Sequence, residues 1–162
     1  MSATCDRGPW SFYGNLAYSR SIEKNITSAQ FKFNPDDLTY ISQHYMHLDH
    51  DQRWTSSVGT AYTANAETNY LTRLSADVFT GSGLRASAPT VPNGRGLPTY
   101  AVLNLSAVQK LNLGIGKGTQ LRLDVLNVTD AKYVIRDGTG VGIGAPQYGL
   151  RRAVLARLAQ KF

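Results

Sequence analysis

Six segments of the chain alternate apolar and polar residues with a period of two, and each run holds about 10 to 14 residues. They cover about residues 10–22, 52–63, 69–80 and 99–111, a fifth run that starts at Leu121, and residues 147–162. Strands of globular proteins usually hold about 5 or 6 residues, whereas a tilted strand needs about 9 to 11 to cross a bilayer. The length of the runs therefore predicts membrane-crossing strands rather than a soluble sandwich.

The connections between these runs alternate between long and short. Residues 23–51, 81–98 and 130–146 form long connections, and residues 64–67 and 114–118 form short ones. Outer-membrane barrels have long extracellular loops and short periplasmic turns. The sequence thus predicts an all-β fold: an antiparallel up-and-down transmembrane β-barrel segment of about six strands, with both termini on the periplasmic side. A small β-barrel binding module, soluble or in a membrane, is the alternative.

The alternation also assigns side chains to faces. Leu121 and Leu123 are expected to face lipid, together with an outward-pointing aromatic set: Trp10, Trp54, Tyr62, Tyr70 and Phe162. Trp54 and Tyr62 lie eight residues apart, which for a tilted strand is roughly 20 Å along the membrane normal, close to the height of the apolar band between two aromatic girdles. The charged residues expected on the opposite, lumen-facing side are Arg73, Asp77, Arg122, Asp124, Arg151 and Arg157.

Two roles are open for these charged side chains. They line a path for a ligand or contact a segment inside the barrel, or they form cross-strand charge pairs in a wet interior. For any individual residue, charge pairing is the preferred interpretation. The polar ending of the fifth run, at Asn127, Thr129 and Asp130, is expected to mark the point where the strand emerges into water.

The first long connection carries the pattern of a short helix from about Pro35 to Tyr45. Asn34 is a good N-cap, Pro35 suits the first helical position, and the two aspartates that follow favour the helix N-terminus. The same segment supplies the candidate ligand-contact residues of an extracellular loop: Tyr40, His44, Tyr45 and His47. Two histidines one turn apart are also able to bind a transition metal. The preferred interpretation is a helix that packs Leu38, Ile41 and Tyr45 while its histidines face water, without a metal.

Charge and histidine content argue against two classes of function. The net charge is +6, but lysine and arginine are scattered rather than clustered among aromatics, so no nucleic-acid interface is expected. The three histidines all fall between residues 44 and 50, so no Ser/His/Asp constellation is expected. We expect no enzyme and no cofactor; an outer-membrane lipid-modifying enzyme is a minor alternative. Cys5 is the lone cysteine, so no internal disulfide forms.

Several longer stretches resemble a known family. The run LDVLNVTDAKYVIRDG, the glycine-rich GTGVGIGAPQYGLRR after it, and a last alternating strand that ends at Phe162 resemble the C-terminus of TonB-dependent outer-membrane receptors. Residues 48–62 (LDHDQRWTSSVGTAY) and residues 81–106 look like the preceding barrel segments. The resemblance covers nearly the whole chain, and it rests on the order and spacing of these stretches.

This resemblance carries expectations about fold, place and partners. Such receptors form a barrel of about 22 strands with a plug domain, so residues 1–162 resemble the C-terminal part of one, without plug domain, coupling segment or signal peptide. The resemblance implies energised uptake of a scarce ligand across the outer membrane: siderophore-iron foremost, otherwise cobalamin or a glycan. The implied partners are outer-membrane lipid, the missing plug and remaining strands, the TonB energy-coupling protein, and the barrel-assembly machinery, which would read Phe162.

Overall fold

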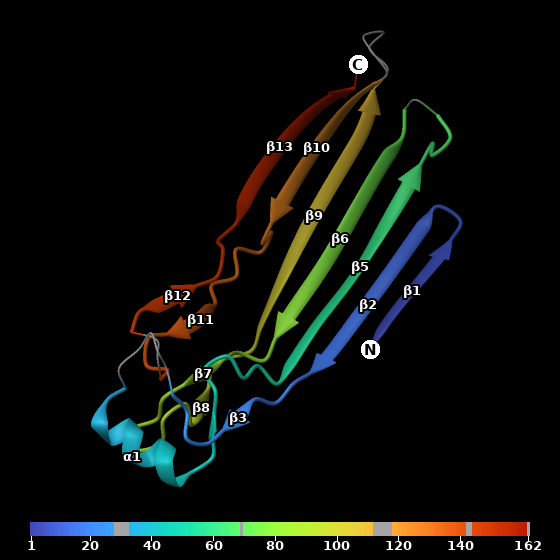
Figure 1. Cartoon of the computed structure of the whole chain (residues 1–162). Helices are drawn as coiled ribbons and strands as arrows, with labels where there is room; N and C mark the ends of the chain where they lie inside the picture. The colour runs from blue at the N-terminus through green and yellow to red at the C-terminus, as the bar shows by residue number, and fades with distance from the viewer. Residues whose placement is uncertain (28–32, 69, 112–117, 142–143, 162) are drawn as a thin grey trace.

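The computed structural model describes residues 1–27, 33–68, 70–111, 118–141 and 144–161. The chain forms one large antiparallel sheet of seven strands in the order β1-β2-β5-β6-β9-β10-β13 (Figure 1). The six longer strands are β2 (Trp10–Tyr18), β5 (Trp54–Ala64), β6 (Thr72–Gly81), β9 (Tyr100–Leu111), β10 (Gly118–Leu126) and β13 (Ala153–Lys161), with 9 to 12 residues each. The predicted all-β, antiparallel, up-and-down order is confirmed.

The seventh strand, β1 (Ser2–Arg7), was not predicted. It pairs with β2 through a tight turn at Gly8 and Pro9, where Gly8 has a positive φ of 57°. Met1 therefore lies beside Leu16, part of the way toward the other end of β2. The prediction that both termini lie at the end with the short turns is wrong for the N-terminus; β13 does run toward that end, because Lys161 pairs with Gly118.

The register of the sheet separates an apolar face from a polar face. Directly paired residues of antiparallel strands project to the same side. One line of partners crosses the sheet through Trp10, Tyr62, Leu74, Ala107, Leu123 and Ala156. The neighbouring line, on the reverse face, runs through Ser11, Ala61, Ser75, Ser106, Asp124 and Leu155. The predicted strand faces are therefore confirmed, with Leu123 and Arg122 on opposite sides.

Aromatic pairs stand at both ends of the apolar face. Trp10 packs on Tyr62 at the end with the short turns, with ring centroids 4.9 Å apart. Tyr18 packs on Trp54 at the end with the long loops, at 4.7 Å. Tyr70 lies in the connection between β5 and β6, so no strand face is assigned to it, and Phe162 and the predicted turn at residues 114–117 lie outside the described residues.

The long connections carry all the remaining elements. These are β3 (Ile22–Glu23), helix α1 (Pro35–Gln43) and β4 (Met46–His47) in the first, β7 (Arg85–Ala86) and β8 (Arg95–Gly96) in the second, and β11 (Val134–Asp137) and β12 (Pro146–Tyr148) in the third. They gather at one end of the sheet (Figure 1). Among the described residues, no helix is long and apolar enough to cross a membrane.

Helix α1 begins as predicted and ends slightly earlier. The side chain of Asn34 accepts a hydrogen bond from the backbone N–H of Asp36 at 3.1 Å, and Pro35 is the first helical residue. Of the three residues expected to pack, Ile41 is buried, whereas Leu38 and Tyr45 are exposed. Ile41 belongs to a small core at the loop end of the molecule that also contains Phe33, Met46, Ala86 and Leu97.

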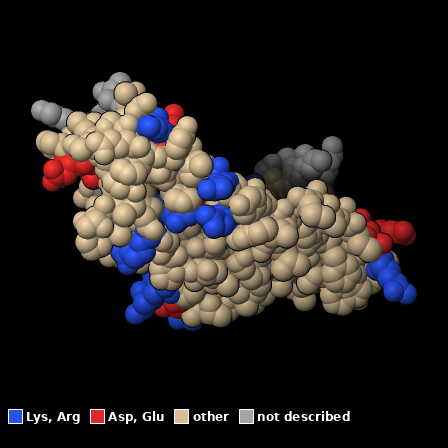
Figure 2. All heavy atoms as spheres, turned by 90° about the horizontal axis from the view of Figure 1, so that it is seen from below, with Lys and Arg blue, Asp and Glu red and all other residues tan. Residues whose placement is uncertain are grey.

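Charged groups are sparse on the side of the molecule that Figure 2 shows. In the view of Figure 2, uncharged residues make up most of the visible surface, and basic and acidic side chains stand in small groups. Within the described residues the sheet is open, since β1 and β13 are its two edge strands. Its apolar face carries many large exposed side chains: Trp10, Phe12, Leu16, Tyr18, Trp54, Val58, Tyr62, Leu74, Leu105, Leu121, Leu123, Val154 and Leu158.

Candidate functional site

Asp51 is the centre of the contacts that join the first two long loops. Its side chain is 1% exposed. The Arg85 guanidinium donates to Oδ2 of Asp51 through Nε at 3.0 Å and through one terminal amino group at 2.9 Å, and the backbone N–H of Ser21 donates to Oδ1 at 2.7 Å. His47 Nδ1 lies 2.8 Å from Oδ2. One buried carboxylate therefore fixes Ser21, His47 and Arg85 around itself.

The protonation states in this cluster follow from its contacts. Burial alone raises the pKa of Asp51, but the hydrogen bonds from Ser21 and Arg85 outweigh it, so the pKa of this carboxyl lies below its usual value of 3.8. Burial and the nearby Arg85 lower the pKa of His47 below 6.5, against the opposing effect of Asp51. At neutral pH, Asp51 is therefore charged and His47 is neutral.

Asn93 joins all three long loops. Its side chain is buried, and its backbone has a positive φ of 53° beside Gly94. The amide nitrogen donates to the carbonyl oxygen of His47 at 2.9 Å, and the amide oxygen accepts from the backbone N–H of Val141 at 2.9 Å. The buried amide of Asn93, which belongs to the second loop, thus forms hydrogen bonds with the backbone of both the first and the third loop.

Two further ion pairs surround this centre. Arg136 of β11 lies 3.1 Å from Asp49, and Arg95 of β8 lies 2.8 Å from Asp137. Because Arg95 and Arg136 connect different pairs of loops, the contacts close a ring around Asp51 and Asn93. We call the three joined connections, residues 21–53, 82–99 and 127–152, the loop layer.

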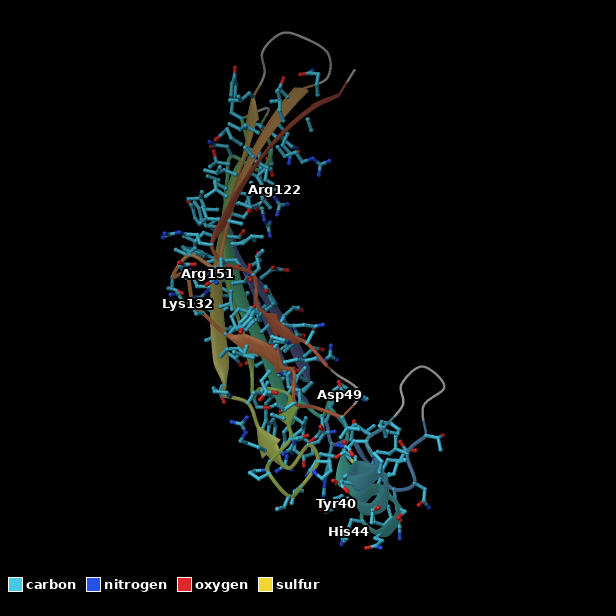
Figure 3. The ribbon with its side chains drawn as sticks, turned by 90° about the vertical axis from the view of Figure 1, so that its left-hand side faces the viewer. Tyr40, His44, Asp49, Arg122, Lys132 and Arg151 are labelled. Carbon is cyan, nitrogen blue, oxygen red and sulfur yellow. The ribbon has the colours of Figure 1, made fainter. Side chains whose placement is uncertain are left out.

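The predicted ligand-contact residues occupy different places in the loop layer. Tyr40 and His44 stack on the exposed side of α1, with ring centroids 4.4 Å apart, and both are labelled in Figure 3. They line a pocket of about 320 Å³ between α1 and residues 87–92, which include Pro89 and Pro92. Tyr45 is 73% exposed, whereas His47 is held against Asp51 and is not an outward-facing ligand group.

No metal centre is formed by these histidines in the part of the chain that the structure describes. No group of three or more His, Cys, Asp or Glu side chains there has the arrangement of metal ligands. His44 contacts the carbonyl oxygen of Tyr40, and His50 contacts Asp49.

Five of the six predicted lumen-facing charges lie on the polar face of the sheet: Arg73, Asp77, Arg122, Asp124 and Arg157. Figure 3 shows the sheet bent, with Arg122 on the inner side of the bend. Arg122 pairs with Asp124 of its own strand at 2.8 Å, rather than across strands. Asp77 accepts a hydrogen bond from Asn104 at 2.9 Å.

Arg151 lies outside the strands, because β13 begins only at Ala153. Its guanidinium binds the carboxylate of Asp130, which also accepts from the backbone N–H of Arg152 at 3.1 Å. The hydrogen bond from Arg151 holds the pKa of Asp130 far below its usual range. The polar end of the fifth run thus anchors the start of the last strand.

Asn127 also holds the start of the last strand, and its contacts explain why β10 ends on polar residues. It is buried, has a positive φ of 49°, and donates to the carbonyl oxygens of Ala131 and Leu150 at 2.9 and 2.8 Å. Next to it, Tyr133 stacks on Tyr100 with ring centroids 4.4 Å apart. A Cβ at Gly149 would lie 1.9 Å from this tyrosine ring, so only glycine fits there.

Sequence reasoning did not single out Asp51, Asn93 or Asn127 as structural centres. The dipeptide Asn93-Gly94 is a turn signal, and Asn127 stands where a strand pattern stops. Both features indicate left-handed backbone, but neither indicates which residues the two side chains bind.

Comparison of the chain with protein-family models, with curated proteins and with solved structures found no match.

Proposed function

We propose that residues 1–162 are part of the β-barrel of a TonB-dependent outer-membrane receptor, with the apolar face of the sheet against lipid and the polar face toward the lumen. The observation that carries the proposal is the uncovered apolar face, which is bounded by the Trp10–Tyr62 pair at one end and the Tyr18–Trp54 pair at the other. Aromatic girdles bound the apolar band of outer-membrane barrels in this way.

The distribution of burial supports the same proposal. Of the buried hydrophobic side chains in the described part of the chain, only Ala61 and Val102 belong to the large sheet, and the others lie in the loop layer. A soluble sheet of this size needs a second layer to cover its apolar side, and soluble monomers rarely expose contiguous apolar patches beyond a few hundred Å². Lipid supplies the second layer without further protein.

The loop layer supports a receptor role. In the proposed orientation it faces the medium, and its ring of contacts around Asp51 and Asn93 holds the Tyr40–His44 surface in a defined place. Ligands of an energised receptor would meet this surface first. The small binding module remains the competing function, and its soluble form differs in needing no membrane.

The first test compares the purified chain in plain buffer with the chain refolded into phospholipid vesicles or detergent micelles. We expect aggregation in buffer, because the apolar face has no cover, and a β-rich circular dichroism spectrum with protease-resistant strands only with lipid or detergent. A monodisperse, β-rich monomer in plain buffer would instead support the soluble binding module.

The uptake role is tested in cells that produce the complete protein, with a radiolabelled ferric siderophore and labelled cobalamin as the two probes. Replacing both Tyr40 and His44 by alanine is expected to lower uptake of one probe several-fold, while the amount of protein in the outer membrane stays constant. Leu38→Ala is the matched control, because Leu38 is an exposed α1 residue outside the pocket. Unchanged uptake of both probes would show that Tyr40 and His44 do not contact the ligand.

A further inference from the structure

Two arginines of the polar face stand directly across from each other. Arg122 of β10 and Arg157 of β13 are paired in the register of these two strands, so their side chains project to the same side. Like charges in directly opposite positions of an antiparallel pair destabilise the sheet. The repulsion between two guanidinium groups in this position is relieved when a negative charge binds between them.

A hollow lies between these two side chains. It measures about 180 Å³ and is lined by Gln120, Arg122, Arg157 and Ala159. Gln120 and Ala159 are themselves a directly opposite pair, one step further along the same face. The small side chain of Ala159 leaves the space open, while Gln120 adds an amide at its edge.

The local charges leave this hollow positive. Arg122 donates to both oxygens of Asp124 through its Nε, at 2.9 and 2.8 Å, and neither terminal amino group of Arg122 is used in this contact. Within the described residues, no hydrogen-bond acceptor contacts the guanidinium of Arg157. Lys110 of β9 stands across from Gln120 on the same face. Three cationic residues, Lys110, Arg122 and Arg157, thus stand in this part of the polar face, and of these three only Arg122 contacts a carboxylate among the described residues, that of Asp124.

We propose that Arg122 and Arg157 form a binding site for one anion, a carboxylate or a phosphate, in the hollow between β10 and β13. Planar guanidinium groups bind both anions through paired N–H donors, and the Nε contact with Asp124 holds Arg122 in place for its terminal amino groups to do so. The inference requires only the register of two strands and does not depend on the receptor role.

The anion has two possible sources with the same chemistry. It is either a free anion in the solvent at the polar face or an acidic side chain of a protein segment that packs against the polar face. In both cases the anion removes the repulsion between the two arginines and ties β13 to β10 at this level.

The test uses the chain refolded in detergent micelles, with inorganic phosphate as the probe and sodium chloride to hold ionic strength constant. Phosphate is expected to raise the unfolding midpoint of the wild-type chain in a saturable manner. Arg157→Gln should weaken phosphate binding by at least about tenfold, since it removes charge-assisted hydrogen bonds. In chloride alone, the same variant should be no less stable than wild type, because the opposed charge is gone.

Arg73→Gln is the matched control. Arg73 lies on the same face but has its own partners, the hydroxyl groups of Thr63 and Ser11, so its loss should leave the phosphate response intact. A measurement without substitution uses the ¹⁵N-labelled Nε groups: phosphate should shift the NMR signals of Arg122 and Arg157 and not that of Arg73. This measurement decides the question if Arg157→Gln does not fold.

Repeating the titration with acetate, and with the complete protein, separates the two sources. If phosphate raises the unfolding midpoint of both the 162-residue chain and the complete protein, the site binds a free anion. A response in the chain alone assigns a carboxylate that already fills the site in the complete protein. Absence of saturable binding of both probes to the wild-type chain, or an equal response of wild type and Arg157→Gln, would overturn the proposal.

Discussion

Asp51→Ala is expected to open the loop layer. The substitution removes the carboxylate around which Ser21, His47 and Arg85 are arranged, and it leaves the Arg85 side chain, which is 14% exposed, without its counter-charge. Removing one partner of a buried ion pair costs about 3–5 kcal/mol. We therefore expect the free energy of opening of the loop layer to fall by about that amount, whereas the seven-stranded sheet keeps its structure.

Hydrogen exchange of the loop amides measures this change. The backbone N–H of Arg85, which donates to the carbonyl oxygen of Asp49 at 3.1 Å, should exchange roughly a hundred-fold to several-thousand-fold faster, at about 1.4 kcal/mol per factor of ten. Amides of β5 and β6 should keep their protection.

Asp37→Ala is the matched control for this prediction. Asp37 is a half-buried aspartate of the same connection and stands in the first turn of α1, so its removal should cost only a few tenths of a kcal/mol of helix-dipole interaction. An equally small effect of Asp51→Ala would mean that the apolar core around Ile41, and not the ion-pair cluster, holds the loop layer.

The alternating strands were predictable because burial or exposure of a whole face imposes a period of two. That pattern located six strands and their faces without any knowledge of pairing, and the loop helix followed from Asn34 and Pro35. Strand β1 was not predicted because the apolar positions in its sequence, SATCDR, hold only the small residues Ala3 and Cys5. The break before β13 was not predicted for a different reason. Tyr148 and Leu150 continue the apolar pattern, but Asn127 binds the carbonyl oxygen of Leu150 and Asp130 binds the backbone N–H of Arg152, just before the strand.

The loop layer was less predictable, because its contacts join residues that are distant in the sequence. Arg85 reaches Asp51 across 34 positions, and Asn93 reaches His47 and Val141 across 46 and 48. No local pattern selects such partners. The histidines illustrate this limit: spacing alone makes His44 and His47 look equivalent, but one stacks on Tyr40 and the other packs against a buried carboxylate.

Leu158→Lys is expected to reduce folding into a bilayer strongly, and Leu155→Lys to have little effect. The two leucines lie three positions apart in β13 and are both exposed, at 72% and 52%. Leu158 pairs with Leu121 on the apolar face, whereas Leu155 pairs with Asp124 on the polar face. A lysine on the lipid side near the bilayer midplane costs about 2–4 kcal/mol, whereas a lysine at position 155 stays on the polar face.

Urea-induced unfolding from phospholipid vesicles measures both variants under the same conditions. Because the side chains are equally large and the substitution is the same, the difference between the two variants isolates the side of the sheet that each residue occupies. Leu158→Lys should lose about 2–4 kcal/mol relative to wild type, and Leu155→Lys less than about 1 kcal/mol, as is usual for surface substitutions. Equal losses in the two variants would contradict the assignment of the apolar face to lipid, and a larger loss for Leu155→Lys would reverse it.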